Sequence, residues 1–100
     1  MKKYRVVITC EVLKNADEIF DYIVVHNPRA AAKIVREFRS RIRSLSTTPR
    51  RCPLAPENGI LDHDEIRHFH HGKYRIIYAV ENNTVSVLEI RHGARLPRGE

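Results

Sequence analysis

The sequence predicts an α+β domain in which two N-terminal helices pack on one face of a small, mainly antiparallel sheet, in the order β-α-α-β-β-β. Two amphipathic stretches precede position 46. Runs rich in β-branched and aromatic residues occupy 4–9, 72–80 and 84–91, and an alternating run at 64–71 is a further expected strand. Helices grouped beside such strands are typical of α+β folds. One hundred residues should form a single domain, 1–100, with one modest core.

The strands at 72–80 and 84–91 should form a hairpin, because the link at 81–83 contains two asparagines that tolerate the positive φ of a tight turn. The strand at 4–9 should join the same sheet, although the sequence does not determine which strand it pairs with. Side chains alternate faces along a strand, so Tyr74, Ile76 and Tyr78 should share one face. Arg75 should then project from the other face.

The first helix is predicted to begin near Asn15, with Glu18 completing a capping box, and to end by 26–27 because Pro28 follows. The second helix should begin there, capped by Asn27 with Pro28 in its first position. Its apolar stripe runs to Leu45, with Phe38 near the centre of the core. The loop at 46–59 holds three prolines and one glycine and is expected to lack regular structure.

Eighteen Lys and Arg against twelve Asp and Glu give a net charge of +6, which favours nucleic acid or an acidic protein segment as a partner. The alternative is a merely basic surface. The second helix carries a row of basic side chains opposite its apolar stripe, which is either a solvated face or a ridge for an acidic partner: Arg29, Lys33, Arg36, Arg39, Arg41 and Arg43.

Several classes of protein are not favoured. No apolar run reaches the roughly 20 residues of a membrane span, and no signal peptide is recognised, so we expect a cytoplasmic protein. Cys10 and Cys52 lack ligand spacing and should be free thiols. Of the histidines at 68, 70 and 71, strand alternation places only His68 and His70 on one face, and no acidic or Cys residue stands at ligand spacing from them, so neither a metal nor another cofactor is expected.

Arg75 lies in mid-strand, where a guanidinium is either salt-bridged or available for a phosphate. The end of the next strand adds further basic or titratable groups, Arg91, His92 and Arg95. We therefore expect Arg75 and His92 to meet on one exposed surface.

Taken together, these patterns resemble the RelE/ParE family of toxin–antitoxin and plasmid-stabilisation proteins. The resemblance covers nearly the whole chain and is strongest in Tyr-Arg-Ile-Ile-Tyr at 74–78 and His-Gly-Ala-Arg at 92–95. It implies the fold predicted above and an antitoxin partner with an acidic segment. It also implies one of two activities, cleavage of mRNA on the ribosome (an mRNA interferase) or inhibition of DNA gyrase without RNA cleavage.

For an endoribonuclease, the resemblance implies that Arg75 stabilises the charged transition state, that His92 acts as the acid and that Arg95 is a second catalytic arginine. Glu57 matches the catalytic glutamate of one branch most loosely. RNA contacts would come from Arg67, Lys73 and Arg91.

The chain departs from RelE itself, which has a lysine cluster on the strand before the hairpin and a C-terminal tyrosine. Two alternatives therefore stay open: a non-catalytic gyrase inhibitor acting through its C-terminal strands and loop, and a non-toxic member kept for operon repression.

Overall fold

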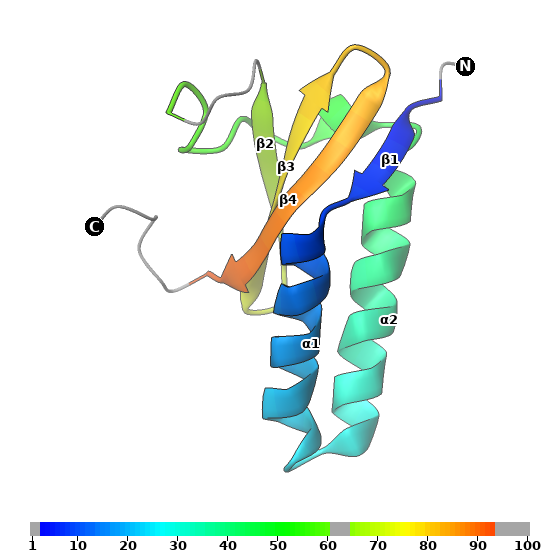
Figure 1. Ribbon diagram of the computed structural model, residues 1–100, viewed down its shortest axis with the longest axis vertical. Coiled ribbons are helices and arrows are strands. Elements are labelled where there is room, and N and C mark those ends of the chain that lie inside the picture. Colours follow the sequence, from blue (N-terminus) through cyan, green and yellow to red (C-terminus); the bar gives the residue numbers. More distant parts are fainter. Residues whose placement is uncertain (1–2, 61–64, 94–100) are drawn as a thin grey trace.

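The structure is a computed structural model and describes residues 3–60 and 65–93. Its elements follow the predicted order (Figure 1). They are β1 (Arg5–Ile8), α1 (Cys10–Val24), α2 (Pro28–Ser44), the one-turn 3₁₀ helix η1 (Pro49–Arg51), β2 (Ile66–His71), β3 (Tyr74–Glu81) and β4 (Thr84–His92).

The four strands form one sheet in the order β1-β4-β3-β2. Strands β2, β3 and β4 are antiparallel neighbours, and β1 runs parallel to β4, with Val6 opposite Val85. The tight turn after β3 places Asn82 at a φ of 54°, as the hairpin prediction required. The mainly antiparallel α+β fold is thus confirmed.

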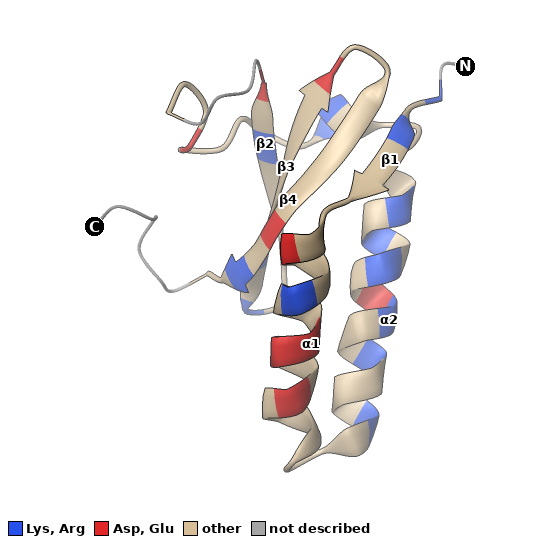
Figure 2. Cartoon of the chain, viewed as in Figure 1, with Lys and Arg blue, Asp and Glu red and all other residues tan. Residues whose placement is uncertain are grey.

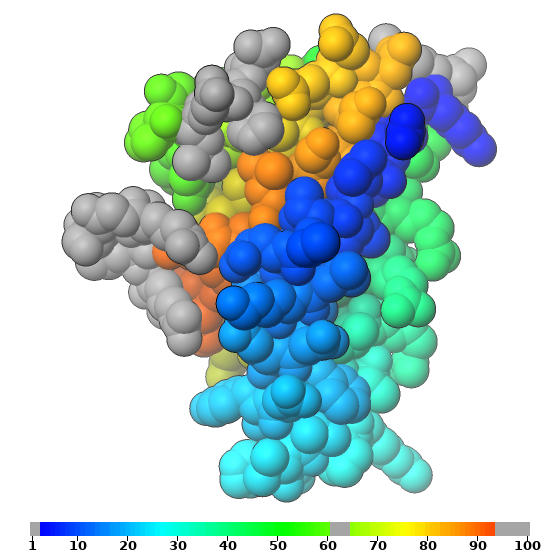
Figure 3. Space-filling view, in the orientation of Figure 1, coloured from blue at the N-terminus to red at the C-terminus, as the bar shows by residue number. Residues whose placement is uncertain are grey.

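The helices form an antiparallel pair on one side of the sheet and extend beyond it at the connection between them (Figure 1). In the space-filling view, α1 and α2 lie against each other along their length (Figure 3). The predicted cap of α2 is confirmed, because Asn27 Oδ1 accepts a hydrogen bond from the Ala30 N–H at 3.1 Å. Pro28 is the first residue of this helix.

The predicted start of the first helix near Asn15 is wrong, because α1 begins at Cys10. Val12, 2% exposed, lies one turn before Ala16 and extends the apolar face onto the sheet, so burial favours the additional turn. Asn15 therefore lies inside the helix. Its Oδ1 accepts a hydrogen bond from the Ile90 N–H at 3.0 Å, which ties α1 to β4.

We call the side of the sheet covered by the helices the helix face. Its core joins Phe38 of α2 to Ile76 and Tyr78 of β3, and Phe38 is only 2% exposed, as predicted. Burial raises the pKa of the Tyr78 hydroxyl, which donates to the Pro49 carbonyl at 2.5 Å. Burial of these large side chains is the main source of stability.

We call the opposite side the loop face. A small second core there consists of Ala55, Ile66, Ile77 and Ala79. The loop at 46–59 was expected to lack regular structure, and this is wrong in part: it contains η1, and Leu54 bridges to Arg67 of β2. Its backbone is held because the Ala55 N–H donates to the Ile66 carbonyl at 2.9 Å.

Two further observations concern the predicted class of protein. Cys10 and Cys52 are both free thiols. Within residues 3–60 and 65–93, no helix is both long enough and apolar enough to cross a bilayer.

Candidate functional site

The centre of the site is Arg75, in the second position of β3. Strand alternation directs Tyr74 and Ile76 to the helix face and Arg75 to the loop face, as predicted. Arg75 is nevertheless only 8% exposed. The expectation that it stands on an exposed surface is wrong, because a residue of the loop covers it.

That residue is Glu57, which is also 8% exposed. Its two carboxylate oxygens accept hydrogen bonds from both terminal nitrogens of Arg75, one of them Nη1 to Oε1 at 3.1 Å. The next residue anchors the loop, since Asn58 Oδ1 accepts from the Ile66 N–H at 2.8 Å. A guanidinium and a carboxylate joined by two hydrogen bonds hold a defined geometry, and here the pair fastens the loop to the sheet.

The Arg75 guanidinium determines the electrostatics of its neighbours. Its hydrogen bonds to Glu57 hold the pKa of that carboxyl below its usual value, against the opposing effect of burial. His68 Nδ1 lies 3.0 Å from Arg75 Nη1 and accepts its hydrogen, because a guanidinium can only donate. Burial and the charge of Arg75 lower the pKa of His68, so its imidazole is neutral at pH 7.

Two charged residues of β4 complete the cluster. Arg91 is the register partner of Arg75, and its Nη1 lies 3.8 Å from Glu57 Oε2 and 4.0 Å from Glu89 Oε1. The side chains of Arg91 and Glu89 are 11% and 17% exposed. We define the loop-face cluster as Glu57, His68, Arg75, Glu89 and Arg91. Its charges largely compensate one another.

His92 does not join this cluster. It is the register partner of Tyr74, and the two rings meet edge to face with centroids 5.7 Å apart. Tyr74 packs against the core on the helix face, so His92 lies on that side of the sheet and Arg75 on the other. The expectation that Arg75 and His92 share one surface is wrong, because residues 91 and 92 alternate faces as Arg75 and Tyr74 do.

The other predicted site residues are distributed around the sheet. Arg67 donates to the Cys52 carbonyl and to Glu65, each at 2.5 Å, so its guanidinium has partners within the fold. Lys73 is exposed in the turn between β2 and β3. Arg95 lies outside the described residues.

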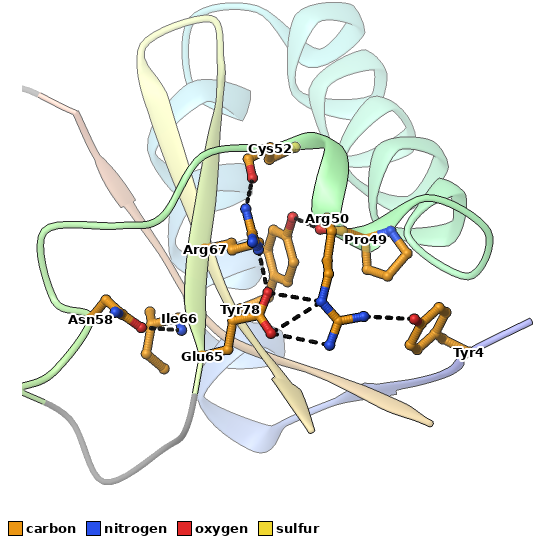
Figure 4. A network of polar contacts seen from close by, with 9 residues as sticks. All are labelled: Tyr4, Pro49, Arg50, Cys52, Asn58, Glu65, Ile66, Arg67 and Tyr78. Carbon is orange, nitrogen blue, oxygen red and sulfur yellow. Dashed lines mark hydrogen bonds and ion pairs between the residues drawn. The ribbon is translucent and has the colours of Figure 1, made fainter. Parts of the chain in front are cut away.

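A second polar network, centred on Arg50 of η1, joins Tyr4, which precedes β1, to Glu65, which precedes β2 (Figure 4). Arg50 donates to both Glu65 oxygens at 3.1 Å and to the Tyr4 hydroxyl at 2.7 Å. Although burial opposes it, the hydrogen bonds from Arg67 and Arg50 lower the pKa of Glu65. The network connects η1 to two strands, and we assign it a structural role.

Sequence reasoning did not connect His68 to Arg75. The available signal was the register between β2 and β3, which pairs His70 with Arg75. This register places His68 diagonally across from Arg75 on the same face of the sheet. Among the described residues, no group of His, Cys, Asp and Glu is arranged to hold a metal ion. Chemically, the cluster offers two carboxylates, a neutral imidazole and two guanidinium groups.

Comparison with solved structures shows which proteins share this fold. The chain is similar to the chromosomal ParDE toxin–antitoxin system from P. aeruginosa (TM-score 0.73, 17% identity, covering 90% of this chain and 96% of that one). It is also similar to the toxin–antitoxin complex RelBE2 from Mycobacterium tuberculosis (TM-score 0.61, 24% identity, 95% and 97% covered). A third similar structure is the archaeal RelE–RelB complex from Pyrococcus horikoshii (TM-score 0.58, 21% identity, 94% and 99% covered).

No curated protein matches the chain by sequence. A family model does: residues 6–97 match that of the ParE toxin of the type II toxin–antitoxin system parDE. The match covers both helices, all the strands from Val6 onward and the loop that carries Glu57. This chain belongs to the ParE toxin family of type II toxin–antitoxin systems.

Proposed function

We propose that the protein acts in the cytoplasm as a toxin that binds DNA gyrase and inhibits it without cleaving RNA. One observation carries this choice between the two family activities. Arg75 is 8% exposed and its guanidinium is held by Glu57, while His92 lies on the opposite face of the sheet. Cleavage of RNA requires an acid, a base and cations around one phosphate. The groups expected to provide them do not converge on one exposed surface.

Inhibition by binding makes a different demand on the molecule. It needs a stable surface and no proton transfer. The Glu57–Arg75 pair holds the loop at 46–59 against the sheet, and the loop and the sheet together provide such a surface. We expect gyrase to be contacted through β3, β4 and the loop at 46–59. The match to a ParE family model over residues 6–97 supports this reading.

The proposal includes a cognate antitoxin. The similar solved structures are described as toxin–antitoxin systems or complexes, and the net charge of +6 suits an acidic binding segment. Co-expression with the product of an adjacent reading frame should restore growth and yield a complex that co-purifies. An adjacent product that neither restores growth nor binds would contradict this part of the proposal.

The decisive experiment induces the protein without antitoxin and follows mRNA ends and plasmid supercoiling in the same cells. We expect supercoiling to be lost first, with mRNA intact. The informative variant is His92→Phe, which keeps an aromatic ring beside Tyr74 but cannot transfer a proton. It should arrest growth as the unaltered protein does.

The opposite pattern would overturn the proposal. New mRNA ends that require His92, in cells whose plasmids stay supercoiled, would establish the endoribonuclease instead. Growth without any defect would favour the non-toxic, repressing member of the family.

An endoribonuclease built on the loop-face cluster is the second candidate. The observation in its favour is the contact of Glu57, Arg75 and a neutral His68, which together supply a base and a phosphate-binding cation. This version predicts mRNA cleavage that survives His92→Phe but is lost in His68→Gln. Intact mRNA with the unaltered protein rejects it.

A further inference from the structure

The outer side of α2 carries five cations in one row. Arg29, Lys33, Arg36, Arg39 and Arg43 are all exposed and lie opposite the apolar stripe of the helix. Figure 2 shows basic residues recurring along α2, whereas α1 is mainly acidic. We call these five side chains the α2 row. Their spacing of three or four residues keeps them on one face of the helix.

Arg41 was expected to be part of this basic face, and that expectation is wrong. Its guanidinium lies 4.6 Å from the centre of the Phe69 ring, and its Nη1 is 3.3 Å from His71 Nδ1. Position 41 lies on the side of α2 that is turned toward the sheet, and there the guanidinium of Arg41 stacks on the Phe69 ring. The remaining five cations still form a continuous row.

The charges of the α2 row are not neutralised within the described part of the chain. No carboxylate of residues 3–60 or 65–93 forms an ion pair with any of the five. The one acidic residue of α2, Glu37, lies 2.9 Å from His71 Nε2, and that hydrogen bond lowers its pKa, with Lys33 and Arg36 adding smaller effects. Over the described ranges, one carboxylate lies near the five cations and none forms an ion pair with them, so the row presents a net positive field to solvent.

The residues between these cations indicate what kind of partner the row would take. Ala32, Ser40 and Ser44 are small and exposed. The exposed large hydrophobic residues of the described chain all lie outside α2: Ile8, Leu13, Tyr22, Val25, Leu54 and Ile60. Protein interfaces have an apolar centre, whereas interfaces with DNA are polar and strongly positive. The α2 row has the second composition.

We propose that the α2 row binds the phosphate backbone of duplex DNA without regard to sequence. The row runs from residue 29 to residue 43, which is about 21 Å along a helix. Duplex DNA carries one negative charge per roughly 1.7 Å of its axis, so a straight row of this length meets a regular array of phosphates. Arginine suits them because its planar fork can donate two hydrogen bonds to one phosphate.

The acidic surface of α1 should orient the DNA on the protein. Glu11, Asp17, Glu18 and Asp21 are exposed on α1, so the two helices carry opposite charge side by side. DNA would be repelled from α1 and attracted to α2. This inference does not depend on which target the toxin inhibits, since the row is on the helices and the loop-face cluster is on the far side of the sheet.

The test measures binding of the full-length protein to two fluorescent 20-base-pair duplexes of unrelated sequence, between 50 and 200 mM salt. If all five cations contact phosphates, affinity should fall about 500-fold over this range, because each contact adds roughly 0.9 to the salt slope. In Arg36→Gln/Arg43→Gln, three contacts remain and the fall should be about 40-fold. The matched control, Lys14→Gln/Arg51→Gln, loses the same charge elsewhere and should keep the full salt dependence.

Each contrary result has a definite meaning. Absence of binding at 50 mM salt overturns the proposal. An equally weakened salt dependence in the control variant also overturns it, because binding would then depend on net charge and not on the α2 row. Tighter binding to poly-glutamate than to either duplex would identify an acidic protein segment as the occupant. Thermal unfolding of both double variants shows that they are folded, and neither gyrase nor ribosomes are present, so the result is independent of the proposed function.

Discussion

The two faces of the sheet are stabilised in different ways. On the helix face, α2 and β3 contribute apolar side chains such as Phe38 and Ile76, which are 2% and 0% exposed. On the loop face, the buried pair of Glu57 and Arg75 stands beside a small apolar core. The helix face depends on packing, which any well-shaped apolar residue can support. The loop face depends on two opposite charges remaining together.

The two faces should therefore respond differently to substitutions. An apolar face tolerates conservative change with a gradual loss of stability. A buried ion pair fails abruptly when one member is removed, because the other charge is left without a partner. The segment that carries Glu57 should therefore be the part of the fold most sensitive to a single charge change.

The largest effect should come from the helix face. Phe38→Ala removes a side chain that is 2% exposed and should cost about 3–5 kcal/mol of unfolding free energy, because it leaves a cavity between α2 and the sheet. Urea denaturation followed by circular dichroism measures this. A midpoint equal to that of the unaltered protein would show that the helix face is not the main core.

On the loop face, Glu57→Gln should cost about 3 kcal/mol, because Arg75 would stay buried without its counter-charge. The double variant Glu57→Leu/Arg75→Met removes both charges at once and should be clearly more stable than Glu57→Gln. The same urea assay compares them. If the double variant is the less stable of the two, the pair is held by something other than charge compensation.

The pH profile of stability should follow from the same cluster and be smaller in effect than the substitution. The pKa of Glu57 is lowered by Arg75, so the unfolded chain binds its proton more readily. This contribution to stability is fully present above the unfolded pKa of about 4.3 and is lost as the pH falls through the folded value. His68, whose pKa is also lowered, adds a loss that begins below about pH 6.5.

Urea midpoints between pH 8 and pH 3 test this sign. Glu57→Gln should flatten the acidic part of the profile, and His68→Gln should flatten the part near pH 6. A protein that becomes more stable on acidification would contradict the assignment of both groups.

The smallest effect should come from the polar contact on the helix face. Asn15→Ala removes the acceptor of the Ile90 N–H and should cost about 1 kcal/mol. Because neither group titrates, the loss should be the same at pH 8 and pH 5. Asn15 Nδ2 also donates to the Glu11 carboxylate at 3.2 Å. A loss that grows on acidification would mean that this second contact, rather than the bond to Ile90, accounts for the effect.

Most of the fold could be predicted because its signals are local. The cap formed by Asn27, the turn at Asn82 and the alternation along 74–78 depend on neighbouring residues only, and all are confirmed. The start of α1 was missed because it depends on burial against the sheet. The sequence shows that Val12 is apolar but not what it packs against. Its burial against the sheet in the folded structure is what favours the additional helical turn.

The candidate site was less predictable for a related reason. The sequence placed Arg75 on the face opposite Tyr74, and period-two alternation is enough for that. It did not reveal that Glu57, 18 residues earlier in a proline-rich loop, would close over the guanidinium. Loop conformation depends on long-range contacts, here the hydrogen bonds of Ala55 and Asn58 with Ile66.

By itself, the sequence determined the type of fold, the order of its elements and the alternation of side chains within the strand at 74–78. These follow from periodicity and from the φ preferences of Asn and Pro, which act over a few bonds. Only the tertiary structure decided that Arg75 is paired and buried and that His92 lies on the opposite face. The physical reason is that the energy of a charge depends on what surrounds it, and those surroundings come from segments distant in the chain.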